Sequence, residues 1–246
     1  MDRDVRRTGG AATAVLAAAL VVALAGPGGP QAGAAPPSAP VPLAPLAPSL
    51  SDPPLAQPSA VVPPRAPVRA PAVVRRGNGD LARVAGAGAR SGSGPLRRYT
   101  VAVEGGLGID PAGFVRTVER VLADERSWGG GGRLSFQRVA DGPVSFRVVL
   151  ASPTTTDRLC APLRTNGRFS CGTGSTAVVN SMRWLRGAAS YAGRLEAYRA
   201  YVVNHEVGHA LGRGHMSCPG RGLPAPVMVQ QTKGTGGCVA QPWPYP

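Results

Sequence analysis

The sequence predicts an α+β fold for a domain that covers residues 97–246. Apolar and polar residues alternate over "RRYTVAVE" at 97–104, which is typical of a half-buried strand. A first helix is expected to start at Asp110, and a second one is expected at about 193–211. A domain of roughly 150 residues is large enough to bury a substantial core.

The first helix has both a start signal and an apolar face. Asp110 can cap the helix with its side chain, and Pro111 suits the first helical position, where a backbone N–H would have no partner. Its apolar residues recur at three- and four-residue spacing: Phe114, Val118, Val121 and Leu122. This pattern predicts a helix with one face in the core.

Three short segments are predicted to be further strands. They are "LSFQRV" at 134–139, "VSFRVVLA" at 144–151 and "STAVVN" at 175–180. The residues at 140–143 include Asp, Gly and Pro, so they are expected to form the turn that joins the first two.

The N-terminal residues 1–26 have the pattern of a secretory signal peptide. Arg3, Arg6 and Arg7 precede an apolar run of about fifteen residues, which is short for a membrane span of roughly 20. Ala23 and Ala25 provide an A-x-A cleavage signal. The protein is therefore predicted to be extracellular or associated with the cell wall. An uncleaved signal anchor is the alternative, and only then would a membrane be a partner.

Residues 27–96 are predicted to be a disordered linker. The stretch 27–95 contains 16 of the chain's 26 prolines, mixed with Ala, Ser and Gly. Proline has no backbone N–H and a fixed φ, so this composition disfavours helices and central strands. A propeptide is the alternative interpretation of the segment.

The net charge of +14 does not by itself indicate a nucleic-acid partner. Of the 27 basic residues, 26 are arginines scattered in runs of at most two, and Lys233 is the one lysine. A binding surface for nucleic acid would be expected to concentrate its charge. We therefore expect no nucleic-acid partner and a monomeric protein.

All four cysteines lie in the predicted domain, and behind a signal peptide an even number favours disulfides. Cys160 and Cys171 bracket Asn166-Gly167, which is a hairpin-turn signal, so they are expected to form a local bridge. The remaining pair is then Cys218–Cys238. Zinc ligation by cysteine is the disfavoured alternative, because no CxxC occurs.

The three histidines of the chain all lie in "YVVNHEVGHALGRGH", at 201–215. His205 and His209 are four residues apart, so on a helix they share a face and can both bind one zinc ion. Glu206 lies beside them as a candidate general base. Gly212 allows a sharp turn that would bring His215 round as the third ligand. The alternative is a histidine cluster without metal.

The complete pattern H-E-x-x-H-x-x-G-x-x-H resembles that of the metzincin zinc metallopeptidases. Members of this family also have a methionine turn beneath the metal, and Met228, 13 residues after His215, matches it. Five segments resemble an actinobacterial family of secreted proteins catalogued as a domain of unknown function. They are "RYTVAVEGGLGIDP", "TTTDRLCAPL", "YVVNHEVGHALG", "PAPVMVQQTKG" and "GCVAQPWPYP". The likeness covers about residues 97–246.

The resemblance implies a twisted mixed sheet with two main helices, above a small C-terminal subdomain that contains the Met-turn. It also implies that substrate binds along an antiparallel edge strand, for which 167–171 is the candidate. Some metzincins have a tyrosine two residues after the turn methionine, whereas this chain has Gln230. The oxyanion-stabilising tyrosine that some metzincins have at this position is therefore absent from this chain.

The site residues predict a secreted zinc endopeptidase. Three neutral histidines leave one zinc position open for water, and Glu206 would accept the water proton. The expected partner is a protein or peptide substrate. Two alternatives stay open, namely a zinc-containing binding module at the cell surface and an amide hydrolase acting on cell-wall peptides.

Overall fold

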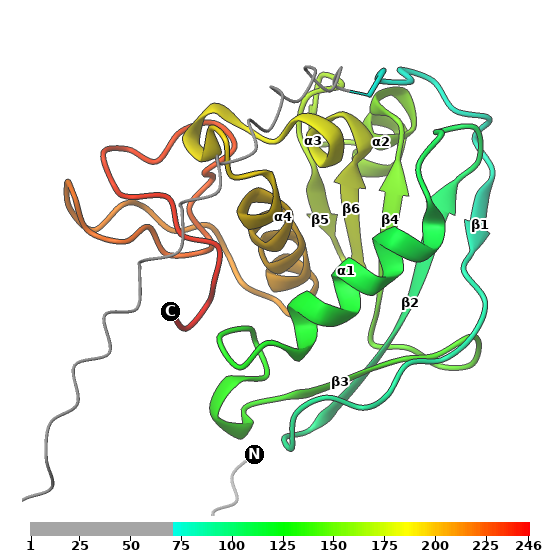
Figure 1. Ribbon diagram of the computed structural model, residues 1–246, viewed down its shortest axis with the longest axis horizontal. Helices are drawn as coiled ribbons and strands as arrows, with labels where there is room; N and C mark the ends of the chain where they lie inside the picture. Colours follow the sequence, from blue (N-terminus) through cyan, green and yellow to red (C-terminus); the bar gives the residue numbers. More distant parts are fainter. Residues whose placement is uncertain (1–70) are drawn as a thin grey trace, which may run out of the picture. The chain divides into compact units, whose positions relative to one another are not determined.

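The computed structural model describes residues 71–246 (Figure 1), so the predicted signal peptide and the linker up to residue 70 lie outside it. In chain order, its strands and α-helices are β1 (Leu81–Arg83), β2 (Leu96–Glu104), α1 (Pro111–Ala123), β3 (Ser135–Arg138), β4 (Phe146–Ala151), α2 (Pro153–Cys160), β5 (Cys171–Thr173), β6 (Thr176–Asn180), α3 (Ser181–Arg186) and α4 (Leu195–Ala210). Two short 3-10 helices lie at Gly130–Gly132 and Ala189–Tyr191. The α+β fold class is thus confirmed.

The six strands form one twisted, open, mixed sheet (Figure 1). Its order is β1-β2-β4-β6-β5, and β3 pairs with the first half of β2. Strands β2, β3, β4 and β6 run parallel to one another, while β1 pairs antiparallel with β2 and β5 pairs antiparallel with β6. The edge position of β5 places it beside α4, which carries the predicted zinc motif.

The turn at 140–143 does not make a hairpin. Strands β3 and β4 both run parallel to β2, and Tyr99 of β2 pairs with Arg138 of β3 and with Phe146 of β4. The chain therefore passes from one side of β2 to the other between the two strands. Turn residues in the sequence indicate a change of course, but they do not decide which strand becomes the neighbour.

Helices cover both faces of the sheet. Val148 and Leu150 of β4 belong to the core beneath α1 and α4, which lie side by side (Figure 1). Val149 and Ala151 alternate with them and pack toward α2. The predicted apolar face of α1 is buried, and Asp110 caps that helix by accepting hydrogen bonds from two backbone N–H groups.

The predicted boundary of the linker at residue 96 is wrong, because the structure is ordered well before it. Strand β1 pairs with β2, the N–H of Val84 donates to Val101, and Ser91 bridges to Phe136. The segment has little alternation of apolar and polar residues. Residues 77–95 are held by backbone hydrogen bonds and by two buried side chains. The carboxylate of Glu104 accepts from the N–H of Gly79 at 2.9 Å, and the guanidinium of Arg138 donates to the carbonyls of residues 84–86.

The C-terminal segment, defined as residues 211–246, contains no helix or regular strand in the structure. It is tied by the disulfide Cys218–Cys238, while Cys160–Cys171 joins α2 to β5, and both pairs agree with the prediction. Within 71–246, no helix is long and apolar enough to cross a membrane.

Candidate metal centre

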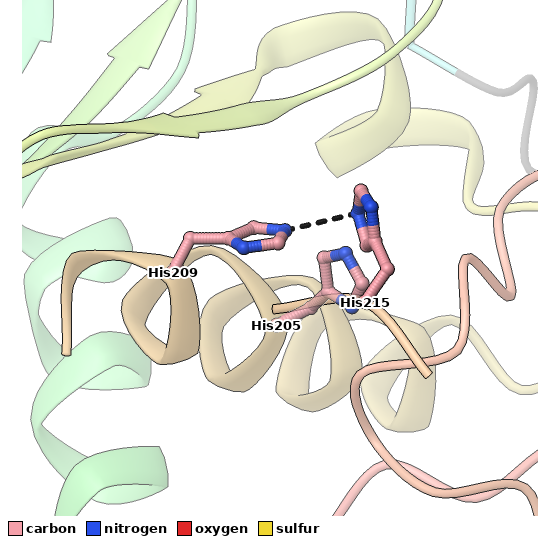
Figure 2. A group of neighbouring side chains, drawn as sticks. All are labelled: His205, His209 and His215. Carbon is pink, nitrogen blue, oxygen red and sulfur yellow. Dashed lines mark hydrogen bonds between the residues drawn. The ribbon is translucent and has the colours of Figure 1, made fainter. Parts of the chain in front are cut away.

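The three histidines that the sequence indicated come together at one end of α4 (Figure 2). His205 and His209 lie one turn apart on this helix, which ends at Ala210. Gly212 follows with φ +82°, a conformation that favours glycine, and the chain returns toward the helix at His215. One nitrogen from each ring lies within 4.8 Å of the other two, and the Nε2 atoms of His209 and His215 are 3.1 Å apart.

Backbone carbonyls orient two of the rings. The Nδ1 of His205 donates to the carbonyl of Val227 at 2.8 Å, and the Nδ1 of His209 donates to the carbonyl of Arg213 at 2.8 Å. Since a carbonyl can only accept, both protons must lie on Nδ1. The Nε2 atoms are left with free lone pairs, which is the arrangement that metal-binding histidines normally have.

The surroundings keep two of the histidines uncharged at neutral pH. Burial lowers the pKa of His205 to about 3, and the neighbouring His209 and His215 act in the same direction. Partial burial also lowers the pKa of His215, together with the nearby His209 and Lys233. Neutral imidazole is the form that binds a metal ion.

Glu206 is buried beside these rings. Its Oε2 atom has no hydrogen-bond partner within the described residues, and burial raises the pKa of its carboxyl group well above the ordinary value. A buried polar atom without a partner is costly and is rarely kept without a role. A divalent cation with its bound water would give this oxygen both a charge and a donor. Three imidazole nitrogens suit zinc, so the residues fit that ion.

The site opens into a cleft of about 260 Å³, referred to below as the histidine cleft. Its walls are the loop 161–170, the start of β5, α4 and the C-terminal segment. The residues that line it are Leu163, Arg164, Thr165, Phe169, Ser170, Cys171, Gly172, His205, Glu206, His209, His215, Gln230 and Lys233. The cleft thus makes side chains on α4 accessible from outside. The Cys160–Cys171 disulfide closes the loop that forms one of its walls.

The candidate substrate strand 167–171 is corrected by the structure. The edge strand β5 starts at Cys171 and ends at Thr173, whereas Phe169 and Ser170 line the cleft without belonging to a strand. Strand β5 lies directly on α4: a Cβ added to Gly172 would be 2.3 Å from the Cβ of His209. Glycine is therefore the residue that lets the sheet edge reach the histidines.

Met228 lies buried against α4, with 3% of its surface exposed. A Cβ on Gly208, between His205 and His209, would be 2.6 Å from the Sδ of Met228 and 2.8 Å from the Cζ2 of Trp128. The carbonyl of Met228 accepts from the N–H of Met216, the residue after His215, at 3.0 Å. Helix, methionine and third histidine are thus in close contact.

Two buried side chains that the sequence did not single out hold this arrangement. The hydroxyl of Tyr201 donates to the carbonyl of Val229 at 3.0 Å and accepts from the N–H of Gln231 at 2.8 Å. The Oε1 of Gln231 accepts from the hydroxyl of Tyr191 and from the N–H of Gln241, and its Nε2 donates to the carbonyl of Gln241. A glutamine in a polar tail gives no sequence signal for such a role.

A model of the family described as "Protein of unknown function (DUF3152)" matches residues 68–237. This range contains the three histidines, Glu206 and Met228, and it begins before β1. Comparisons with curated proteins and with solved structures found no match. The early start of the matched range agrees with the ordered segment seen ahead of β2.

Proposed function

We propose that this chain, which belongs to the DUF3152 family, is a secreted zinc-dependent endopeptidase. The observation that carries the proposal is the pairing of three converging imidazoles with a buried carboxylate, that of Glu206, whose Oε2 has no hydrogen-bond partner within residues 71–246. A binding module would have no need for an unpartnered buried carboxylate beside the metal ligands, since desolvating it costs free energy. A hydrolase needs such a group as its base.

The chemistry that zinc supplies when bound is Lewis-acid activation of water and of the scissile carbonyl. His205, His209 and His215 would hold the ion. The carbonyls of Val227 and Arg213 keep two of the rings in the right tautomer. Glu206 accepts one proton from the attacking water and delivers it to the nitrogen of the leaving amine as the C–N bond breaks.

The resemblance to metzincins extends the proposal to the surroundings of the site. Met228 takes the place of the turn methionine, and the segment 211–246 forms the small lower part. Strand β5 would receive the substrate as an added antiparallel strand. The antiparallel edge position of β5 and its contact with α4 support this assignment.

Secretion is proposed from the signal peptide at 1–26 and is supported by the two disulfides. Structural disulfides persist in oxidising compartments and are rare in the cytosol of most organisms. Placement outside the cell or at its wall follows from the same argument.

The experiment combines metal analysis with a substrate screen. The full chain should contain one zinc by elemental analysis and should cut denatured proteins or purified cell-wall peptides, with new termini identified by mass spectrometry. A chelator should abolish cleavage, and zinc should restore it where magnesium does not, because magnesium prefers oxygen ligands. A folded protein that neither binds zinc nor regains it would contradict the proposal. Cleavage of wall peptides alone would favour the amide hydrolase.

A further inference from the structure

The histidine cleft has a positive charge of its own, in addition to any metal. Arg164 and Lys233 both line it, and Glu206 is the one carboxylate among its lining residues. Glu206 is buried against the histidines and serves the proposed chemistry. The surface that a substrate meets is therefore lined by two cations without a matching acid.

Neither cation is neutralised by an ion pair within residues 71–246. The six ion pairs of that region use other basic groups: Arg83, Arg116, Arg120, Arg126, Arg138 and Arg199. Asp157 of α2, close to the cleft in the chain, is occupied by groups of the loop 161–170. It accepts from the N–H of Gly167 at 2.7 Å and from the hydroxyl of Thr165. The charges of Arg164 and Lys233 thus remain available to a ligand.

Lys233 is held at the place where two hollows meet. A second cleft, of about 550 Å³, shares His215, Gln230 and Lys233 with the histidine cleft. The Nζ of Lys233 donates to the Oε1 of Gln230 at 3.3 Å and lies 5.2 Å from the ring centroid of Phe169. A peptide that continues from the metal centre into the second cleft must pass this ammonium group.

Arg164 extends from a wall that is fixed at several points. The loop 161–170 is closed by the Cys160–Cys171 disulfide and braced by the hydrogen bonds to Asp157. A fixed loop presents its charge with less loss of conformational freedom than a free one. The backbone that carries Arg164 is therefore fixed beside the cleft, while Lys233 is held by its contacts with Gln230 and Phe169.

We propose that the cleft selects peptides that carry a carboxylate near the scissile bond, with Lys233 as the main specificity-determining residue and Arg164 as its support. The inference rests on the proposed peptidase function and names its substrate class. The carboxylate can be an acidic side chain or the free C-terminus of a peptide, and both offer the same group to an ammonium ion.

The test is a binding experiment on the zinc-loaded Glu206→Gln variant of the full chain, in which the substrate is not consumed. Four pools of synthetic peptides are compared by mass spectrometry of the retained fraction. They contain either Asp and Glu or Asn and Gln at the same positions, with either a free or an amidated C-terminus. We expect about 10-fold preferential retention of carboxylate-bearing pools, the size of one charge-assisted hydrogen bond.

Three further variants are built on the same background. Lys233→Met should reduce the preference to below about 3-fold, while Lys233→Arg should keep most of it. Arg168→Met is the matched control, because it also removes one positive charge, from the loop that carries Arg164, at an exposed position that does not line the cleft. It should leave the preference unchanged.

The arms of the experiment separate the sources of the carboxylate. Loss of preference on amidation assigns it to the C-terminus, and loss on the change to Asn and Gln assigns it to side chains. Equal retention of all four pools, including no retention of any, overturns the proposal, and so does a preference that survives in Lys233→Met. The same pools are then given to protein with Glu206 intact. Preferential retention without cleavage would refute the proposed hydrolysis but not the proposed selection of carboxylates. Cleavage without preferential retention would refute the selection but not the hydrolysis.

Discussion

The sheet region, from β1 to α4, and the C-terminal segment 211–246 are built on different principles, and the candidate metal centre lies where they meet. The sheet region is positioned by repeated strand hydrogen bonds and by alternating apolar residues. The C-terminal segment has no regular strand or helix, and it is held by one disulfide, by the buried amide of Gln231 and by a few buried apolar side chains such as Val227 and Met228. Two of the centre's three histidines, His205 and His209, come from the first region, and His215 comes from the second. The geometry of the three histidines therefore depends on one disulfide and a small number of individual hydrogen bonds in the C-terminal segment.

Each region contains a buried polar side chain that forms several hydrogen bonds, and the two can be compared. In the sheet region, the carboxylate of Glu104 accepts from the N–H groups of Gly79 and Ser152 and from the hydroxyl of Thr155. In the C-terminal segment the neutral amide of Gln231 has the comparable position. Because Glu104 can be protonated and Gln231 cannot, lowering the pH should destabilise the sheet region through Glu104. It should have no such effect on the C-terminal segment through Gln231.

The largest expected effect comes from removing the disulfides one at a time. Cys218→Ser with Cys238→Ser, and Cys160→Ser with Cys171→Ser, should each lower the free energy of unfolding by about 3 kcal/mol. The sequence separations are 20 and 11 residues, but the stabilisation rises only with the logarithm of the loop length. Only the first pair should weaken zinc binding, because it releases the segment that carries His215. Denaturant unfolding and zinc competition with a chelator measure the two effects. Equal zinc loss in both would remove the distinction between the regions.

Gln231→Leu should have a slightly smaller effect on stability, about 2–3 kcal/mol. The change leaves the buried hydroxyl of Tyr191 and the half-buried N–H of Gln241 without their partner. It also frees the segment whose carbonyl at Val227 orients His205, so zinc affinity should fall together with stability. Calorimetry and zinc titration on one sample provide the check. A drop in stability with unaltered zinc affinity would show that the segment is positioned by other contacts.

Glu104→Gln tests the charged counterpart and should cost about 2 kcal/mol at neutral pH, where charge-assisted hydrogen bonds are lost. Burial raises the pKa of Glu104, but hydrogen bonds from Ser152, Thr155 and Gly79 outweigh this, and the pKa lies below its ordinary value. The carboxylate therefore stabilises the fold above the unfolded-state pKa, and this contribution is lost as pH falls through the folded-state pKa. Unfolding measured between neutral and acid pH should have a flatter profile in the variant. Parallel profiles would contradict it.

Met228→Leu should have the smallest effect, below about 1.5 kcal/mol, because the volume is nearly conserved. Met228 packs on Gly208 of α4 and is not one of the three residues grouped as candidate metal ligands. Zinc content should therefore survive, with a modest loss of activity. Complete loss of zinc from a folded variant would point to direct ligation by the methionine sulfur.

Those parts of the structure that depend on local pattern could be predicted from the sequence. Helix α1 begins at its cap Asp110 as expected, and α4 occupies 195–210 within the predicted 193–211. The histidine cluster follows from helical spacing and one glycine, Gly212. These features need only residues that are close in the chain.

Features that depend on distant partners escaped prediction. Strand β1 is three residues long and owes its place to the backbone of β2. The edge strand β5 begins at Cys171, where the preceding loop allows it to meet α4, rather than at 167. The buried position of Gln231 depends on Tyr191 and Gln241, which approach it only in the folded chain.

The central claim is that a zinc-activated site uses Glu206 as its base, and one comparison tests it directly. Glu206→Gln keeps the shape of the side chain but cannot accept a proton, and it removes none of the three histidine ligands. Parent and variant are given the same protein and peptide mixture, and the zinc content of each sample is measured. We predict equal zinc, an intact fold and a loss of turnover of roughly 10²–10⁴ in the variant. Equal cleavage by the two proteins at equal zinc content would contradict the account.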